Sequence, residues 1–458
     1  MNRKMKRVII LIFLSIFVIN FTYAQVWYVS GSGSDNSDGK TEKTAFRTLQ
    51  KAANLVNPGD IVYVGNGVYA NSDNSDNSAV LHIKRSGTPN AWITWKALPG
   101  HKPEVQTTGW GGITIESSYH IVDGLHVIGK NDSIALIHAI ADTKNASPNP
   151  VFNTNGIFIN GRNSKPDEKP HHIIIRNCIV GKCPGGGITA IEADYVTIED
   201  CKVFNNAWFM RYGGSGITTL NNWAFDDAPG YHIIIQRNLV WNNKCFVPWE
   251  KIGKLSDGNG ILLDVTNQDG QNITNPNADV IIQQDQATSA KPASNKPKRP
   301  IWKNRALIAN NVSAYNGGSG IHTFRTSHVD IINNTTYWNG TSVDYEELFP
   351  NRSNDIVILN NIIVPRPGGR ITSNNRNTAI RWDYNIYPVE QNIFKGEHDI
   401  VADPLFMNAQ LDLSISDFRL KKGSPALNSG TDEVAQPTDI LGNKRPKGAG
   451  RDRGAFEQ

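Results

Sequence analysis

Cysteine, net charge and long apolar runs are all scarce in this sequence. The four cysteines among 458 residues are too few for a scaffold framed by disulfide bonds. The formal charge of +4 comes from four basic residues within the first seven positions, so the rest of the chain carries equal numbers of basic and acidic side chains. That balance, with no phosphate-cradling loop and no stripe of basic and aromatic residues, excludes a globally basic nucleic-acid binder.

The one long apolar run stands at the N-terminus. Its stretch VIILIFLSIFVINF follows the four basic residues and ends in TYA before Gln25. A basic start, a short apolar stretch and small residues are typical of a secretory signal peptide, here predicted over residues 1–24 with cleavage after Ala24. The run is too short for a comfortable membrane span, and no second one follows. We therefore expect an exported protein, secreted or periplasmic, without a membrane span.

Two short phrases alternate along the rest of the chain. One is an alternating apolar run that ends in Asn, as in ALIANN from Ala306 and VDIINN from Val329. The other is Gly-Ile followed by alternating residues, as in GILL at Gly260 and GIHTF at Gly320. Alternation with period two between Gly and Asn predicts short strands. A strand this short cannot bury a face alone, but stacked coils can share one continuous core.

The spacing of the Asn phrases gives the length of one coil. Asn311 and Asn334 are 23 residues apart, as are Cys178 and Cys201. We therefore predict an all-β fold, a right-handed parallel β-helix over residues 25–430, whose coils stack about 4.8 Å apart. Side chains at one turn then form an inward ladder of hydrogen-bonded amides, and the two cysteines occupy the same column, with a disulfide between them left open. The ladder is predicted from Asn238, Asn311, Asn334 and Asn361.

Three segments depart from the repeat. TAFRTLQKAANLVNPGD predicts an amphipathic capping helix over about residues 45–57, with Thr44 as its N-cap. The repeat drifts out of register from about Asp403, and residues 431–458 are expected to form a tail packed on the last coils. A polar stretch over about residues 265–303 is expected to leave the coil as a long excursion, either a solvated loop or a lid that attracts an acidic chain. Basic residues gather at its end: Lys291, Lys296, Lys298, Arg299, Lys303 and Arg305.

Both ends of the sequence after the signal peptide resemble a known group of proteins. The opening WYVSGSGSDNSDGKTEKTAFRTLQKAANLVNPGDIVYVGNGVY resembles the N-terminal cap of exported bacterial β-helix proteins of the pectate-lyase-like group, and is similar to that of family-nine polysaccharide lyases. The tail SPALNSGTDEVAQPTDILGNKRPKGAGRDRGAFE resembles the end of the same group. The resemblance implies a coil rich in Asp that binds calcium, and a lysine on the next coil that acts as base.

The segment SDGNGILLD is the closest counterpart of that calcium-binding coil. It offers Asp257, Asn259 and Asp264 as oxygen donors, although the family's adjacent pair of aspartates is absent. The next coil offers His322 and Arg325 in GIHTFRTSH and has no lysine there.

Strand alternation places these residues on one face of the predicted solenoid. Asp264 in GILLD and His322 in GIHTF are both expected to point outward, on adjacent coils. Just upstream, NNWAFDD adds an indole and two carboxylates. The sequence therefore predicts a concave strip of carboxylates, an imidazole, a guanidinium and an indole, on which sugars stack and to which hard cations bind.

This set of side chains fits β-elimination on an acidic polysaccharide that contains uronate. The C6 carboxylate must be neutralised so that a base can remove the C5 proton. Calcium or Arg325 is predicted for the first role, and His322 and Lys254 rank above Lys251 and Arg325 as the base. The predicted catalytic residues are His322, Lys254, Arg325 and Asp264; the substrate-binding residues are Trp223, Asp226, Asp227, Lys251 and His328; the metal ligands are Asp257, Asn259 and Asp264.

Two other functions remain open. A glycoside hydrolase would pair Asp264 with Asp257, Asp226 or Asp227 as acid and base. A non-catalytic protein would bind carbohydrate with the same strip. The cations around the aspartates favour the lyase, because a neutral glycan makes no use of them. The expected partner is a polysaccharide and not a nucleic acid, and the protein is expected to be a monomer.

Overall fold

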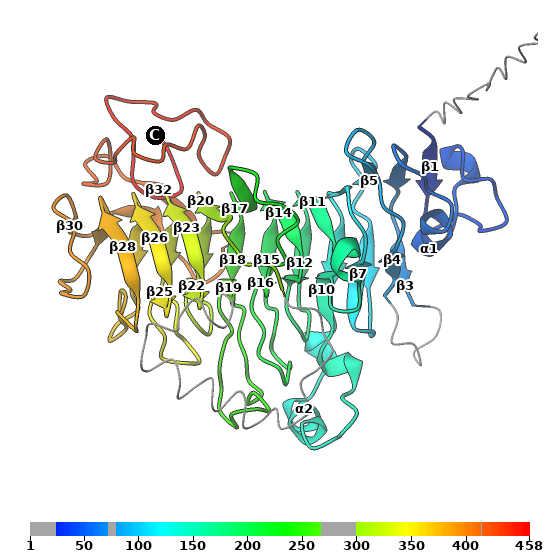
Figure 1. Cartoon of the computed structure of the whole chain (residues 1–458), viewed down its shortest axis with the longest axis horizontal. Coiled ribbons are helices and arrows are strands. Elements are labelled where there is room, and N and C mark those ends of the chain that lie inside the picture. The colour runs from blue at the N-terminus through cyan, green and yellow to red at the C-terminus, as the bar shows by residue number, and fades with distance from the viewer. Residues whose placement is uncertain (1–23, 72–78, 267–298, 414) are drawn as a thin grey trace, which may run out of the picture.

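The computed structural model describes residues 24–71, 79–266, 299–413 and 415–458. Nearly all of the predicted signal peptide and residues 267–298 of the predicted excursion lie outside these ranges. The described strands form three long parallel sheets, called A, B and C below, which run side by side along the molecule (Figure 1). In the middle of the molecule each coil of chain contributes one strand to sheet C, then one to sheet A, then one to sheet B.

Sheets A and B have eleven described strands each, and sheet C has eight. Sheet A consists of β1 (Val26–Val29), β2 (Ile61–Val64), β5 (Ile93–Ala97), β8 (His120–Asp123), β11 (His171–Arg176), β14 (Asp194–Glu199), β17 (Tyr231–Gln236), β20 (Arg305–Ala309), β23 (Ser327–Ile332), β26 (Asn354–Leu359) and β28 (Thr378–Asp383). Sheet B consists of β3 (Val68–Ala70), β6 (Glu104–Gln106), β9 (His126–Ile128), β12 (Ile179–Gly181), β15 (Lys202–Phe204), β18 (Leu239–Trp241), β21 (Val312–Ala314), β24 (Thr335–Tyr337), β27 (Ile362–Val364), β29 (Ile386–Tyr387) and β30 (Ile400–Val401). Sheet C consists of β4 (Leu81–Ile83), β7 (Gly111–Ile115), β10 (Asn155–Asn160), β13 (Ile188–Ile191), β16 (Ile217–Leu220), β19 (Ile261–Asp264), β22 (Ile321–Phe324) and β25 (Leu348–Asn351).

Few elements lie outside the coils. Strands β31 (Phe406–Asn408) and β32 (Asp417–Leu420) form an antiparallel pair. The helices are α1 (Leu49–Ala53), α2 (Leu136–Asp142) and the 3-10 turns η1 (Glu42–Thr44), η2 (Asn131–Ser133), η3 (Pro150–Phe152) and η4 (Pro166–Glu168). In the described part of the chain, no helix has the length and apolar character that a membrane span requires.

The register of the sheets confirms the predicted coil length. Strand β20 pairs in parallel with β23 so that Ala306 lies opposite Val329, 23 positions further on. Inward side chains stack in columns of branched aliphatic residues, which pack well on a pleated surface. One such column in sheet C is fully buried and includes Ile157, Ile188, Ile217, Ile261 and Ile321.

The predicted Asn ladder lines the two-residue turn from sheet A to sheet B and is confirmed. The Asn311 Oδ1 atom accepts hydrogen bonds from the backbone N–H and the Nδ2 of Asn238, at 2.9 and 3.0 Å. Asn334 receives the same pair from Asn311, and Asn361 from Asn334. All four side chains are fully buried. Cys178 and Cys201 lie in the same column as free thiols.

A second ladder, which the sequence pattern did not predict, lines the turn from sheet B to sheet C. It runs through the buried residues Asn206, Asn243, Asn316 and Asn339. At one end, the Cys183 N–H donates to Asn206 Oδ1 at 2.9 Å. At the other end, Glu347 accepts the backbone N–H and the Nδ2 of Asn339, each at 2.6 Å. Burial raises the pKa of Glu347 to about 8, so this carboxyl is largely protonated at neutral pH.

The two ends of the helix differ in detail from the predictions. Helix α1 does cap the first coils, but it is shorter than predicted and its N-cap is Thr48, whose side chain accepts from the Lys51 N–H. Thr44 instead ends η1. The C-terminal tail packs on the outer face of sheet B and reaches back to Trp241 on β18, so it covers middle coils as well as the last ones (Figure 1). Apolar side chains of the tail and of the preceding strand β32 fill this contact, among them Ala455 of the tail and Phe418 of β32.

Candidate active site on the outer face of sheet C

The outer face of sheet C carries the predicted strip. Parallel pairing places Leu220 beside Asp264 and Asp264 beside Phe324 on three successive strands. The column next to it holds Leu262 beside His322. These side chains therefore lie on the predicted face of the sheet, in adjacent columns. Strand alternation does not determine which of them the loops cover.

Asp257 and Asp264 are brought together at β19. Burial raises the pKa of Asp257 to about 6, although the Ser256 hydroxyl donates to its Oδ2 at 2.9 Å. Burial and the Asp257 charge raise the pKa of Asp264 to about 7, against the opposing effect of Arg325 and Arg299. Asp257 lies in the loop before β19 and Asp264 at the end of that strand. Two neighbouring carboxyls whose pKa values burial raises towards neutral are candidates for an acid–base site.

Tyr345 belongs to the same site, although no pattern in the sequence indicated it. Its hydroxyl lies 3.4 Å from Ser256 Oγ, which in turn bonds Asp257. The residue comes from the loop 338–347 before β25, and burial raises its pKa. A hydroxyl donor is therefore linked to the carboxyl pair through one side chain.

The position of Asp257 depends on a glycine in the preceding loop. Gly213 has φ of +71°, and a Cβ atom there would stand 2.3 Å from Asp257 Oδ2. Asp257 itself has φ of +65° and precedes Gly258 at +71°. Only a residue without a side chain at position 213 leaves room for the carboxylate where it is.

The proposed metal ligands do not fit calcium. Asn259 is fully buried, and its Oδ1 already accepts the Ser319 N–H at 2.9 Å while its Nδ2 donates to Ser215 Oγ at 3.2 Å. Asn259 is therefore a structural amide between coils. Calcium takes six to eight oxygen ligands, and no group of three or more His, Cys, Asp or Glu side chains suited to a metal occurs in the described ranges.

His322 is on the predicted face but is not exposed, which corrects the prediction of an accessible base. Its ring stacks on Phe349 at 4.6 Å and meets Phe324 and Tyr345 edge-on. Only 6% of the residue is exposed, and neither ring nitrogen has a hydrogen-bond partner in the described structure. Burial lowers the pKa of His322 to about 3, so the imidazole is a weak base.

The two candidate lysines lie in a loop tip. Lys254 and Trp249 form an antiparallel bridge in the loop 242–260, and Lys251 Nζ lies 5.7 Å from the Trp249 ring. Both lysine side chains are exposed. The charges that act on the pKa of Asp264 are those of Asp257, Arg325 and Arg299. The arginines, and not the two lysines, are therefore the cations that the structure places at Asp264.

Four of the five predicted substrate-binding residues lie around the turn from sheet C to sheet A, where each has a partner. Trp223 is buried beneath Lys169, whose Nζ lies 4.5 Å from the ring. Asp226 accepts a hydrogen bond from the Tyr195 hydroxyl at 2.7 Å. Asp227 pairs with Lys303 at 2.7 Å, and His328 pairs with Asp355 at 2.7 Å. These contacts hold the four side chains in the turn, and their role in substrate binding stays a prediction. The described basic end of the excursion is paired as well, since Arg305 bonds Asp330 and Asp355.

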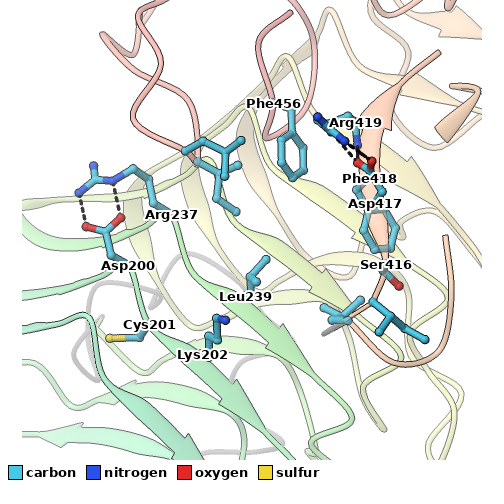
Figure 2. A pocket seen from close by; sticks show the side chains of 14 residues that line it. Asp200, Cys201, Lys202, Arg237, Leu239, Ser416, Asp417, Phe418, Arg419 and Phe456 are labelled. Carbon is cyan, nitrogen blue, oxygen red and sulfur yellow. Dashed lines mark hydrogen bonds and ion pairs between the residues drawn. The ribbon is translucent and has the colours of Figure 1, made fainter. Parts of the chain in front are cut away.

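A cavity of about 510 Å³ lies elsewhere, between the outer face of sheet B and the C-terminal tail (Figure 2). Figure 2 shows two ion pairs at its rim, Asp200 with Arg237 and Asp417 with Arg419. Its lining includes Phe456 and none of the residues of the strip. The cavity and the carboxyl pair are therefore separate features.

Sequence and structure comparisons agree on the architecture. A family model described as a right handed beta helix region matches residues 111–283. The crystal structure of pectate lyase Pel9A matches with a TM-score of 0.51 at 13% identity, over 96% of this chain and 98% of that one. A rhamnogalacturonan lyase matches with a TM-score of 0.44 at 14% identity, over 84% and 91% of the two chains. A lacto-N-biosidase from Eubacterium ramulus matches with a TM-score of 0.42 at 14% identity, over 79% of this chain and 56% of that one.

No significant match was found among curated proteins. At these identities the structural similarity supports the fold alone, and the chemistry must be inferred from the residues of the site. The predicted fold class is confirmed: the chain is a right-handed parallel β-helix of the pectate-lyase-like type.

Proposed function

We propose that the outer face of sheet C cleaves an acidic polysaccharide by β-elimination at Asp264. The observation that carries the proposal is the Asp264 carboxyl at the end of β19, whose pKa is raised to about 7 while the Arg325 guanidinium acts on it from the next coil. A base with a pKa near the working pH and a cation for the uronate carboxylate are the two groups that elimination requires. The resemblance of the N-terminal cap to family-nine lyases and the predicted signal peptide support the same function.

The proposed reaction assigns one role to each group. Arg325 binds the C6 carboxylate of the sugar and thereby makes the C5 proton more acidic. The Asp264 carboxylate removes that proton, the freed electron pair forms a double bond between C4 and C5, and the C4–O bond breaks. The leaving oxygen takes a proton from the Tyr345 hydroxyl, which Ser256 links to Asp257. Asp264 replaces His322 and Lys254 as the proposed base, because His322 is buried with a low pKa and Lys254 lies in a loop tip.

One observation favours hydrolysis as a second candidate. Asp257 and Asp264 have staggered pKa values of about 6 and about 7. A pair of carboxyls with separated pKa values can supply the base and the acid of a glycoside hydrolase. In that reaction Asp264 would have to be protonated, whereas elimination needs its carboxylate.

The two reactions differ in product and in pH dependence. The purified chain is incubated with a panel of uronate polymers, and the ultraviolet absorbance of the new double bond is followed together with the reducing ends. If the reaction is elimination, the absorbance increases with time, and the rate of this increase rises with pH through about 7 as Asp264 ionises. Hydrolysis predicts reducing ends without absorbance, at a rate that falls above about pH 7. Asp264→Asn should abolish either activity, and Asp132→Asn, at the exposed ion pair with Lys182 outside the predicted site, is the control that should not.

A further inference from the structure

A second polar cluster lies on the outer face of sheet C, three strands before Asp264. Its members come from three adjacent strands and form a chain of hydrogen bonds. His82 Nε2 lies 2.8 Å from Glu116 Oε2, Asn160 Nδ2 donates to Glu116 Oε1 at 2.9 Å, and Arg162 Nε donates to Asn160 Oδ1 at 3.1 Å. These hydrogen bonds hold the Nε atom of the Arg162 guanidinium in place. Alternation from Gly156 already places Asn160 on the outer face, but nothing in the sequence joins these four residues.

The rest of the Arg162 guanidinium is available to a ligand. Its central carbon lies 5.3 Å from the centroid of the Phe158 ring, a position that orients the planar group. Arg162 is exposed at the surface, and no carboxylate lies within ion-pair distance of it in the described ranges. The two acidic side chains that act on it electrostatically have other partners, since Glu192 pairs with Lys169 at 2.6 Å and Glu116 pairs with His82.

Asn160, which anchors Arg162, and Asp264 lie on the same outer face of sheet C. Asn160 pairs with Ile191, Ile191 with Leu220, and Leu220 with Asp264, so the anchor of Arg162 and the proposed base share one column of the sheet. Three strand spacings of about 4.8 Å separate them, about 14 Å in all. The side chains between them, Ile191 and Leu220, are apolar and carry no competing charge.

We infer that Arg162 forms a binding subsite for the carboxylate of a sugar unit several positions from the cleaved bond. The inference rests on the proposed function, because it takes the same polysaccharide to run along the column. A guanidinium fork with its Nε held by Asn160 matches the two oxygens of a carboxylate, and its remaining N–H groups can donate to both. In this proposal the outer face of sheet C recognises two acidic units, one at Arg325 and one at Arg162, and selects chains that carry negative charge at both places.

The test measures binding without turnover. In the Asp264→Asn background, dissociation constants are measured by calorimetry for galacturonate and mannuronate oligosaccharides of two to eight units, with and without Arg162→Met. We expect Arg162→Met to weaken binding of the longest bound oligomer about tenfold, the effect of losing a charge-assisted pair, and to leave the dimer unchanged. Arg162→Lys should give an intermediate loss, because it keeps the charge but lacks the fork. Arg47→Met, at an exposed arginine of the N-terminal cap, is the matched control.

The outcomes separate this inference from the proposed function. If long oligomers bind and Arg162→Met changes nothing, the subsite is refuted while the lyase proposal stands. If the substitution affects only sulfated oligosaccharides run in parallel, the carboxylate assignment is wrong. If no acidic oligosaccharide binds to the folded protein, both proposals fail. Asn160→Ala, which releases the Arg162 Nε, should reproduce part of the loss, and a circular-dichroism melt of each variant confirms that it is folded.

Discussion

Asp264→Asn should stabilise the protein at high pH and abolish its activity. The carboxyl has its pKa raised to about 7 from the ordinary value of 3.8, so the folded state holds its proton more tightly than the unfolded state does. Below about pH 4 both states are protonated and the residue costs nothing. As pH rises from about 4 to about 7, the unfolded state gains stability by ionising while the folded state does not, so the free energy of unfolding falls.

The size of the effect follows from the shift. About three pKa units correspond to about 4 kcal/mol at 1.36 kcal/mol per unit, and partial solvent exposure of the side chain reduces this to about 2 kcal/mol. An asparagine has no charge to desolvate and keeps the shape of the side chain. In a chain of this length about 1 kcal/mol corresponds to about 1 °C, so the midpoint of thermal unfolding should rise by about 2 °C at pH 8.

Differential scanning calorimetry at pH 5 and pH 8 checks the prediction. The gain at pH 5 should be about two fifths of the gain at pH 8, because pH 5 lies only part of the way from the unfolded pKa of 3.8 to the folded pKa of about 7. Asp227→Asn, at the exposed pair with Lys303, should show no such gain. An equal change at both pH values, or a loss of stability at pH 8, would refute the reasoning that burial and the Asp257 charge set the pKa of Asp264.

Two further substitutions test the scaffold and the corrected base. Asn311→Ala should lower the free energy of unfolding by about 3–4 kcal/mol, because it removes four buried hydrogen bonds, two from Asn238, one to a strand carbonyl and one to Asn334, at about 1 kcal/mol each. A loss below about 1 kcal/mol in a denaturant titration would contradict that role. His322→Leu should keep or raise the melting temperature, since the imidazole is buried against Phe349 with both nitrogens unpaired, and should retain activity within about twofold. A loss of turnover in a stably folded His322→Leu would restore His322 as the base.

The repeat could be predicted because its signal is local and periodic. A spacing of 23 residues between Asn311 and Asn334 is visible in the sequence, and stacking of like residues in adjacent coils then follows from strand geometry. The outward direction of the Asp264 and His322 side chains was predicted for the same reason. The sequence also holds a signal for the second ladder: Asn243, Asn316 and Asn339 each lie five residues after Asn238, Asn311 and Asn334 and so repeat their spacings. This ladder was missed because the residues were not aligned at that offset, whereas its end at Glu347 breaks the Asn pattern and is visible only in the structure.

The sequence by itself determined the β-helix, the inward and outward faces of its strands, and the coil that carries Asp257 and Asp264. Only the tertiary structure decided that Tyr345 and Phe349 cover His322, that Asn259 is bound between coils, and that His82 reaches Arg162 through two intervening side chains. The physical reason is that period-two alternation fixes the direction of a side chain but not what a loop places over it. Burial and neighbouring charge, which set the pKa of each candidate, come from residues distant in sequence.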